Sequence, residues 1–186
     1  EYLKKNVLGK LTEEAEKLDV EETGLVALDW LNGRRTPFAD QALKGAIIGL
    51  TLGTTAPKVF RSLVEATAFG AKAIADQFIS EGVEIEQVIA LGGIPKKNSF
   101  VMQVTADVLN MPIKVVTSEQ ACALGAAMFG AVAAGVYSTV QEAQEKMGSG
   151  FSDIYYPKAE NAGKYQVLFG KYVELGKSLE SQLRNI

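Results

Sequence analysis

Apolar residues recur along the chain with two spacings, one typical of helices and one typical of strands. The clearest helical stripe lies between residues 58 and 80, and it contains Val59, Leu63, Ala66, Gly70 and Ile74. Thr55 and Pro57 fit a helix start, and Gly82 fits a helix end. The spacing therefore predicts a long helix with one apolar face.

Other segments have helical patterns of the same kind. Residues 1–23 are charged and predict a surface helix or a linker, and a shorter helix is expected between Ser99 and Asn110. The last predicted helix covers residues 159–183. Its apolar face contains Tyr165, Leu168, Tyr172 and Leu175, which we expect to lie in the core.

Short apolar runs separate these helices and predict strands. They fall within residues 24–31, 45–52, 87–93 and 113–116. A glycine-rich break and an aromatic segment, FSDIYYP, precede the last helix. Strands that alternate with helices need crossover connections, so we expect an α/β fold with a mixed, mostly parallel sheet flanked by helices.

The run from residue 121 to residue 137 carries no charge. It reaches the lower limit of a bilayer span, about 17 residues, but it consists mainly of Ala and Gly, which favour close packing. We therefore expect a buried core helix here, with Cys122 as a small buried apolar residue. Thr117 with Gln120, and Ser138 with Gln141, have the spacing of capping boxes at the starts of this helix and of the next.

Composition excludes several classes of protein. The chain has 186 residues and fits one domain, its net charge of −3 gives no electrostatic case for nucleic acid or membrane binding, and it contains no histidine. Triads and metal sites that use histidine are therefore absent, and no carboxylate cluster resembles a metal site. A single cysteine and no visible signal peptide predict a cytoplasmic location, and the start at Glu1 predicts a piece of a longer protein.

The loop ALGGIPKKNSF is the best candidate for chemistry. Gly92 and Gly93 end a predicted strand, and Lys96, Lys97 and Asn98 follow them. Paired glycines let the backbone come close to a flat base or a phosphate, and Lys or Asn supplies hydrogen-bond donors. The residues therefore fit a nucleotide-binding loop, although a Gly pair after a strand also fits a simple tight turn.

The remaining polar residues suggest less. We expect Arg34 and Arg35 to point into water, and Asp29 to cap a turn rather than act as a base. Glu65 and Asp107 lie inside predicted helices, where we expect surface or packing-edge positions.

Three segments together resemble the C-terminal domain of the FGGY carbohydrate kinases. They are GLTLGTTAPKVFRSLVEATAFGAKAI, LGGIPKKNSFVMQVTADVLNMPIKVV and QACALGAAMFGAVAAG, and the similarity extends over residues 24–180. The resemblance implies an actin-like (ribonuclease H-like) domain. It also implies a second domain, an ATP site in the cleft between the two, and Mg²⁺-dependent transfer of the γ-phosphate to a sugar hydroxyl.

The resemblance also assigns residues to the nucleotide site. The second glycine of the family's loop falls on Gly93 and would lie against the adenine, beside Gly92. The family's adenine-contacting Asn falls on Lys97, and Asn98 comes one position later, so either residue could take that role. The family's catalytic Asp and phosphate loops lie upstream, so no catalytic residue is assigned here and the chain alone is expected to be inactive.

The resemblance divides the chain into residues 1–23, a helical segment or linker from an upstream domain, and residues 24–186, the ATP-side kinase domain. The segments look more like those of kinases for L-ribulose than those for glycerol or xylulose, which implies transfer to the 5-hydroxyl of L-ribulose. The expected partners are ATP or ADP, a ketopentose and the upstream domain. A kinase for another ketopentose or polyol, or a non-catalytic nucleotide-binding module, stays open.

Overall fold

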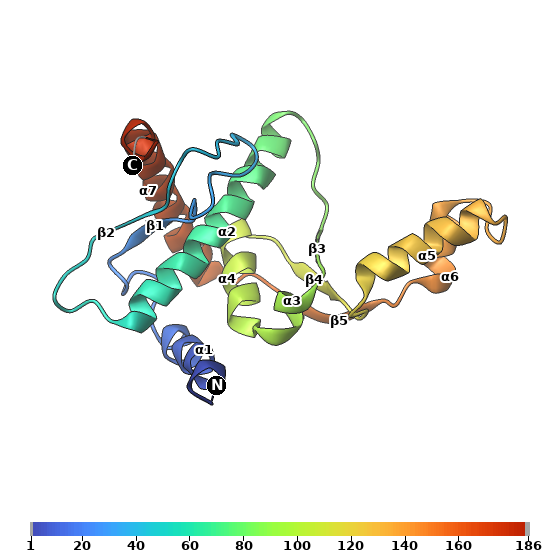
Figure 1. Ribbon diagram of the computed structural model, residues 1–186, viewed down its shortest axis with the longest axis horizontal. Helices are drawn as coiled ribbons and strands as arrows, with labels where there is room; N and C mark the ends of the chain where they lie inside the picture. Colours follow the sequence, from blue (N-terminus) through green and yellow to red (C-terminus); the bar gives the residue numbers. More distant parts are fainter. Residues whose placement is uncertain (1, 185–186) are drawn as a thin grey trace.

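The computed structural model describes residues 2–184, with side chains from residue 7 onward, and shows helices and strands in alternation (Figure 1). The elements are α1 (Tyr2–Glu16), β1 (Val26–Leu28), β2 (Ala46–Ile48), α2 (Ala56–Ser80), β3 (Val88–Ala90), α3 (Gly93–Lys97), α4 (Ser99–Leu109), β4 (Ile113–Val116), α5 (Ala121–Ala133), α6 (Val140–Met147), β5 (Phe151–Tyr155) and α7 (Ala159–Leu183). The predicted α/β class is confirmed, and the two long helices lie close to their predicted bounds.

The strands form two separate ladders. β1 and β2 pair antiparallel, with Val26 opposite Ile48, while β3 pairs parallel to β4 and β4 pairs antiparallel to β5. The mixed sheet is thus confirmed, but of these pairings only the one between β3 and β4 is parallel. The extra antiparallel strand is β5, which lies in the segment predicted only as aromatic, because its polar Ser152 and Asp153 interrupt the strand pattern.

The core lies between α2 and α7, as the apolar stripes predict. Tyr165, Leu168 and Tyr172 of α7 are buried, and Phe69 of α2 packs against Tyr172 with ring centroids 5.5 Å apart. Aromatic contacts of this kind contribute beyond the apolar area that they bury. The face of α7 predicted to lie in the core is therefore confirmed for these side chains.

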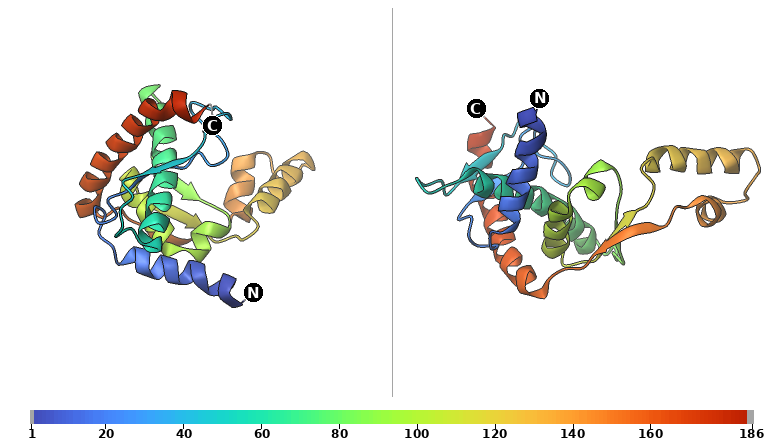
Figure 2. Two further views of the ribbon diagram at one scale, coloured as in Figure 1. Left: turned by 60° about the vertical axis from the view of Figure 1, so that its left-hand side comes forward. Right: turned by 90° about the horizontal axis from the view of Figure 1, so that it is seen from below.

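α5 and α6 project from the rest of the molecule as an arm (Figures 1 and 2). The expectation of a buried core helix is wrong for this chain, because Met128 is the one buried residue of α5 and Cys122 is exposed. Small apolar residues indicate close packing but do not identify the packing partner, and here α5 packs against α6. Among the helices of the described part, none has the length and apolarity that crossing a bilayer requires.

The predicted caps of the arm helices are displaced. α5 begins after Gln120 without a side-chain cap, so Thr117 does not cap it. The cap of α6 is Thr139, whose hydroxyl accepts a hydrogen bond from the Glu142 amide, one residue after the predicted Ser138. Ser138 and Thr139 are both residue types that can cap a helix, and the backbone conformation decides which of them does so.

α1 is packed rather than loose. Ala15 and Val20 are fully buried, and Arg61 of α2 donates hydrogen bonds to the carbonyl oxygens of Ala15 at 2.9 Å and Leu18 at 2.7 Å. Most described residues of the segment are exposed, as expected of a surface helix, and its buried residues Ala15 and Val20 anchor it to the core. Residues 1, 185 and 186 lie outside the described chain.

Substitution of Gly49 should weaken the β1–β2 ladder. Gly49 has φ +87°, and a Cβ there would collide with the carbonyl oxygen of Gly24. A left-handed backbone conformation costs a residue with a Cβ about 1–2 kcal/mol. We expect Gly49→Ala to lower the free energy of unfolding by at least this amount. Gly53→Ala is the matched control in a denaturant titration, because its Cβ would make only an ordinary contact at 3.8 Å. Equal stability of the two variants would contradict the assigned backbone.

Candidate functional site

The candidate site begins where β3 ends. Gly92 has φ +100°, a backbone conformation that residues with a Cβ rarely adopt. Gly93 is the first residue of α3. A Cβ added to Gly92 or to Gly93 would meet nothing within 4 Å, so both glycines border open space. The chain therefore turns sharply here and leaves its backbone accessible.

The two candidate donors after the glycines differ in their surroundings. Asn98 is the cap of α4: its Oδ1 accepts from the Val101 amide at 3.1 Å and its Nδ2 donates to the Thr12 hydroxyl at 3.3 Å. The predicted cap, Ser99, is instead the first residue of the helix. Lys97 is exposed. Both ends of the Asn98 amide are thus hydrogen-bonded, whereas Lys97 is exposed to solvent.

The loop after β3 lies beside the loop after β4. The two strands are parallel, so their carboxyl ends share one edge of the sheet, and Lys96 donates from Nζ to the Thr117 carbonyl oxygen. Figure 1 shows α3 and the start of α5 at this edge. Ligands of open α/β sheets bind outside the carboxyl ends of the strands, which makes this edge the expected position of a ligand.

The surface of this edge suits a flat ring. Leu91 and Ile94 flank the glycine pair and are 54% and 64% exposed. An aromatic base can lie against exposed apolar side chains and bare backbone, and a nearby ammonium can donate to its ring nitrogens. The structure therefore brings together Gly92, Gly93 and Lys97 at one accessible surface, and it uses Asn98 to hold the adjoining helix.

Comparison with known proteins gives the family. The family model described as "FGGY family of carbohydrate kinases, C-terminal domain" matches residues 3–134. The chain belongs to the FGGY family of carbohydrate kinases. The ribulokinase of Vibrio parahaemolyticus is 48% identical over 180 residues, which are 97% of this chain and 32% of that protein. The ribulokinase of Halalkalibacterium halodurans is 45% identical, over 91% of this chain and 31% of that protein.

Solved structures agree with this assignment. The ligand-bound xylulose kinase from Lactobacillus acidophilus superposes with a TM-score of 0.82 at 26% identity, over 93% of this chain and 35% of that one. The predicted family and the actin-like fold are confirmed. The FGGY domain described here spans about a third of the length of the curated relatives that it matches.

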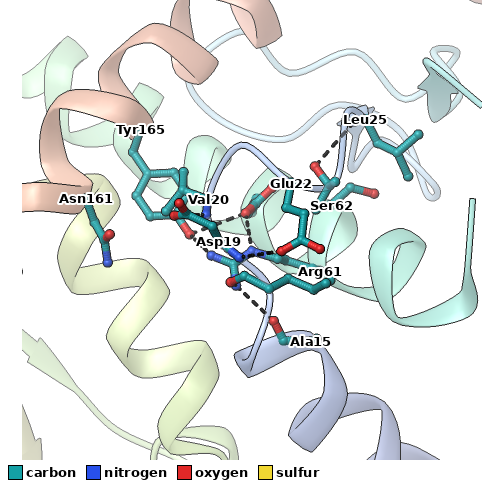
Figure 3. Close-up of polar contacts among 12 residues, drawn as sticks. Ala15, Asp19, Val20, Glu22, Leu25, Arg61, Ser62, Asn161 and Tyr165 are labelled. Atoms are coloured by element: carbon teal, nitrogen blue, oxygen red, sulfur yellow. Dashed lines mark hydrogen bonds and ion pairs between the residues drawn. The ribbon is translucent and has the colours of Figure 1, made fainter.

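A buried polar cluster surrounds Arg61 (Figure 3). Arg61 pairs with Glu65 at 2.8 Å and also donates to the Tyr165 hydroxyl at 3.0 Å, and all three side chains are almost fully buried. The expectation of a surface or packing-edge position for Glu65 is wrong. Glu65 is adjacent to Ala66 of the helical stripe, and its carboxylate also accepts a hydrogen bond from the Tyr165 hydroxyl of α7, which is distant in the sequence. Because Arg61 also bonds to the Ala15 carbonyl, the cluster joins α1, α2 and α7.

Asp107 is buried as well, contrary to expectation. It accepts hydrogen bonds from the Lys158 amide at 2.8 Å and from the Asn161 side chain at 2.7 Å, so it fastens α4 to the start of α7. Since α4 begins directly after the glycine loop, this contact fixes the helix that carries the Asn98 cap. Helical spacing places Arg61 four residues before Glu65, and Gln103 four residues before Asp107, but it does not show that the two carboxylates are buried. Their other partners, Tyr165, Lys158 and Asn161, are distant in the sequence.

The polar residues near β1 also differ from expectation in part. Arg34 does not point into water: it forms a two-pronged ion pair with Glu180, both distances 3.1 Å, and lies over the Trp30 ring. Arg35 is exposed, as predicted. Asp29 accepts a hydrogen bond from the Tyr172 hydroxyl at 3.1 Å.

The stability of the FGGY domain should depend on pH through Glu65. Burial raises the pKa of Glu65 from 4.5 to about 7, although Arg61 opposes the shift. Between pH 4.5 and about pH 7, Glu65 keeps a proton in the folded state and releases it in the unfolded state. The free energy of unfolding therefore falls as pH rises, by at most about 1.4 kcal/mol per pH unit. Denaturant titrations of the wild type and of Glu65→Gln should show this contribution only in the wild type. The same pH slope in both proteins would contradict the assignment.

Proposed function

We propose that this chain is the nucleotide-binding, C-terminal domain of a kinase that transfers the γ-phosphate of ATP to the 5-hydroxyl of L-ribulose. The observation that carries the sugar assignment is the 48% identity to a ribulokinase over 97% of this chain. The glycine loop at the edge of the sheet supports the nucleotide assignment, because its open backbone and exposed Lys97 fit an adenine ring.

The chemistry is proposed to need the remainder of the parent kinase. Phosphoryl transfer depends on positioning and charge neutralisation from both sides of the transferred group. Residues 7–184 contain no group of three His, Cys, Asp or Glu side chains that could hold a metal. Mg²⁺ is usually held by one or two carboxylates together with substrate phosphates, so we place the ion with the nucleotide phosphates and with residues outside this chain.

In this arrangement the domain binds and orients the nucleotide and supplies no catalytic base. We place the adenine against Gly93 and the hydrogen-bond donor at Lys97, since the Asn98 amide is already bonded to Val101 and Thr12. The parent kinase is proposed to act in the cytoplasm, where its ATP is available, and to take part in sugar catabolism such as that of arabinose.

A screen of the full-length parent kinase tests the proposal. ATP-dependent phosphorylation, followed by ADP release, is expected to be fastest with L-ribulose among ketopentoses and polyols. Faster turnover of xylulose would favour the second candidate, a xylulose kinase, which the superposition on the Lactobacillus acidophilus enzyme supports. The isolated 186-residue chain should show no turnover. Ribulose-dependent ADP release by this chain alone would contradict the proposal that phosphoryl transfer needs the remainder of the parent kinase.

Separate alanine substitutions should distinguish the two candidate donors. Lys97→Ala is expected to raise the KM for ATP several-fold with an unchanged melting temperature, because Lys97 is exposed. Asn98→Ala should instead lower stability by about 1 kcal/mol, the usual cost of a lost helix cap, with a smaller change in KM. The reverse pattern would assign the adenine contact to Asn98.

A further inference from the structure

A groove lies on a different part of the molecule from the glycine loop. It has a volume of about 260 Å³ and is bounded by α2, α7 and the loop that follows β1. Figure 1 shows that loop crossing α2 between β1 and β2. The loops after β3 and β4 contribute no lining residue, so the groove is separate from the proposed nucleotide site.

Two helical glycines let the end of β1 enter between the helices. A Cβ on Gly70 of α2 would lie 3.1 Å from Oδ2 of Asp29, and a Cβ on Gly176 of α7 would lie 3.0 Å from the Trp30 ring. Trp30 is almost fully buried, while Asp29 is partly buried and lines the groove. The two close approaches therefore fix a carboxylate at the groove between two helices.

Asp29 keeps acceptor capacity for a ligand. Its Oδ1 accepts the Tyr172 hydroxyl, and a carboxylate offers about four lone-pair sites. Burial raises the pKa of Asp29, while the Tyr172 hydrogen bond opposes the shift. A partly desolvated carboxylate next to a cavity is stabilised by a further hydrogen-bond donor, such as a hydroxyl.

The rest of the groove is apolar with cations at the surface. Phe38, Ile74 and Val173 are among its lining side chains, and Phe38 is 62% exposed. Arg35 and Lys177 also line the groove and are exposed. The charge of Arg34 is compensated by Glu180, which leaves Arg35 and Lys177 as the cations that can meet a ligand carboxylate.

We propose that this groove binds a small hydroxy acid with an aromatic or apolar body. The hydroxyl donates to Asp29, the body lies against Phe38 and Ile74, and the carboxylate pairs with Arg35 and Lys177. The volume is close to the lower end of the range for small-molecule sites, about 300 Å³, so the ligand is small. The proposal goes beyond the proposed phosphotransfer and does not depend on the nucleotide site.

Calorimetric titration of the full-length parent kinase with 4-hydroxyphenylacetate tests this site. We expect saturable binding of one molecule per chain. Phenylacetate, which lacks the hydroxyl, and 4-hydroxyphenylethanol, which lacks the carboxylate, should each bind about ten-fold more weakly, because hydrogen bonds to charged groups are worth that much or more. No binding of 4-hydroxyphenylacetate, or equal affinity for the three probes, would overturn the proposal.

Variants locate the binding. Ala73→Leu fills the groove from α2 without removing a polar group and should abolish binding. Lys177→Gln should weaken it about two-fold, since Arg35 still pairs with the carboxylate and exposed pairs contribute little, whereas Lys171→Gln, which removes an exposed charge outside the groove, should leave it unchanged. Unchanged binding in Ala73→Leu would place the ligand elsewhere and overturn the proposal. L-Ribulose phosphorylation, measured on the same proteins, reports on the proposed function separately.

Discussion

Arg61→Ala is expected to lower the free energy of unfolding by about 3–5 kcal/mol, because it leaves a buried carboxylate without its cation. The Arg61 and Glu65 side chains are only 5% and 2% exposed, so water cannot replace the lost partner. Arg61 also supplies the hydrogen bonds that hold the Ala15 and Leu18 carbonyl oxygens. Chemical denaturation at a pH above 7, where the wild-type Glu65 carboxylate is ionised, measures the loss. Because Arg61 lowers the pKa of Glu65, the variant must either keep an unpaired carboxylate or take up a proton, and each costs stability at this pH.

A matched pair on the same helix provides the control. Lys72 and Asp76 form an ion pair at 2.9 Å with the same spacing, but Asp76 is 43% exposed. Lys72→Ala should therefore cost only about 1 kcal/mol, the sum of a solvent-exposed helical pair and of the contact between the ammonium and the Phe169 ring at 5.2 Å. The double substitution Arg61→Met with Glu65→Leu should recover the part of the loss that comes from the unpaired charge. It should not recover the part that comes from the Ala15 and Leu18 carbonyl oxygens, which still lack their donor. Similar losses for Arg61→Ala and Lys72→Ala would show that the Arg61 pair is not buried.

Gly93→Val in the full-length parent kinase is expected to raise the KM for ATP about ten-fold or more, a loss of at least about 1.4 kcal/mol in nucleotide binding. The added side chain would occupy the space in which we place the adenine. A Cβ at Gly93 meets nothing within 4 Å in the protein itself, so the melting temperature should change little. Steady-state kinetics and thermal unfolding of the same preparation measure the two effects.

Gly163→Val serves as the comparison for this substitution. Gly163 lies in α7, and a Cβ there also meets nothing within 4 Å. The variant should keep the wild-type KM for ATP. An unchanged KM in Gly93→Val would contradict the position proposed for the adenine, whereas a raised KM in both variants would show that the effect is not local.

The sequence predicted the elements that have a long, regular pattern. The stripe of α2 and the aromatic face of α7 repeat over many turns, so their bounds and their buried faces could be read directly. β5 was missed because Ser152 and Asp153 interrupt its pattern. The exposed position of α5 could not be predicted, since a run of Ala and Gly indicates close packing without indicating a partner.

The candidate site was predictable in outline. The Gly92–Gly93 pair after an apolar run indicated a tight loop, and the structure gives Gly92 a positive φ. The engagement of Asn98 was not predictable, because its second partner, Thr12, is 86 positions away in the sequence. The same limit applies to Glu65, whose carboxylate accepts a hydrogen bond from Tyr165, 100 positions away in the sequence. Local periodicity reports which residues share a face, and long-range contacts decide which polar groups remain free.

A crystal structure of the full-length parent kinase with ADP tests the central claim most directly. The account predicts that the adenine lies against Gly93 at the carboxyl edge of β3 and β4, with the Lys97 ammonium within hydrogen-bond distance of the ring. It also predicts that Asn98 keeps its bonds to Val101 and Thr12. An adenine bound elsewhere, including the groove between α2 and α7, would contradict the account.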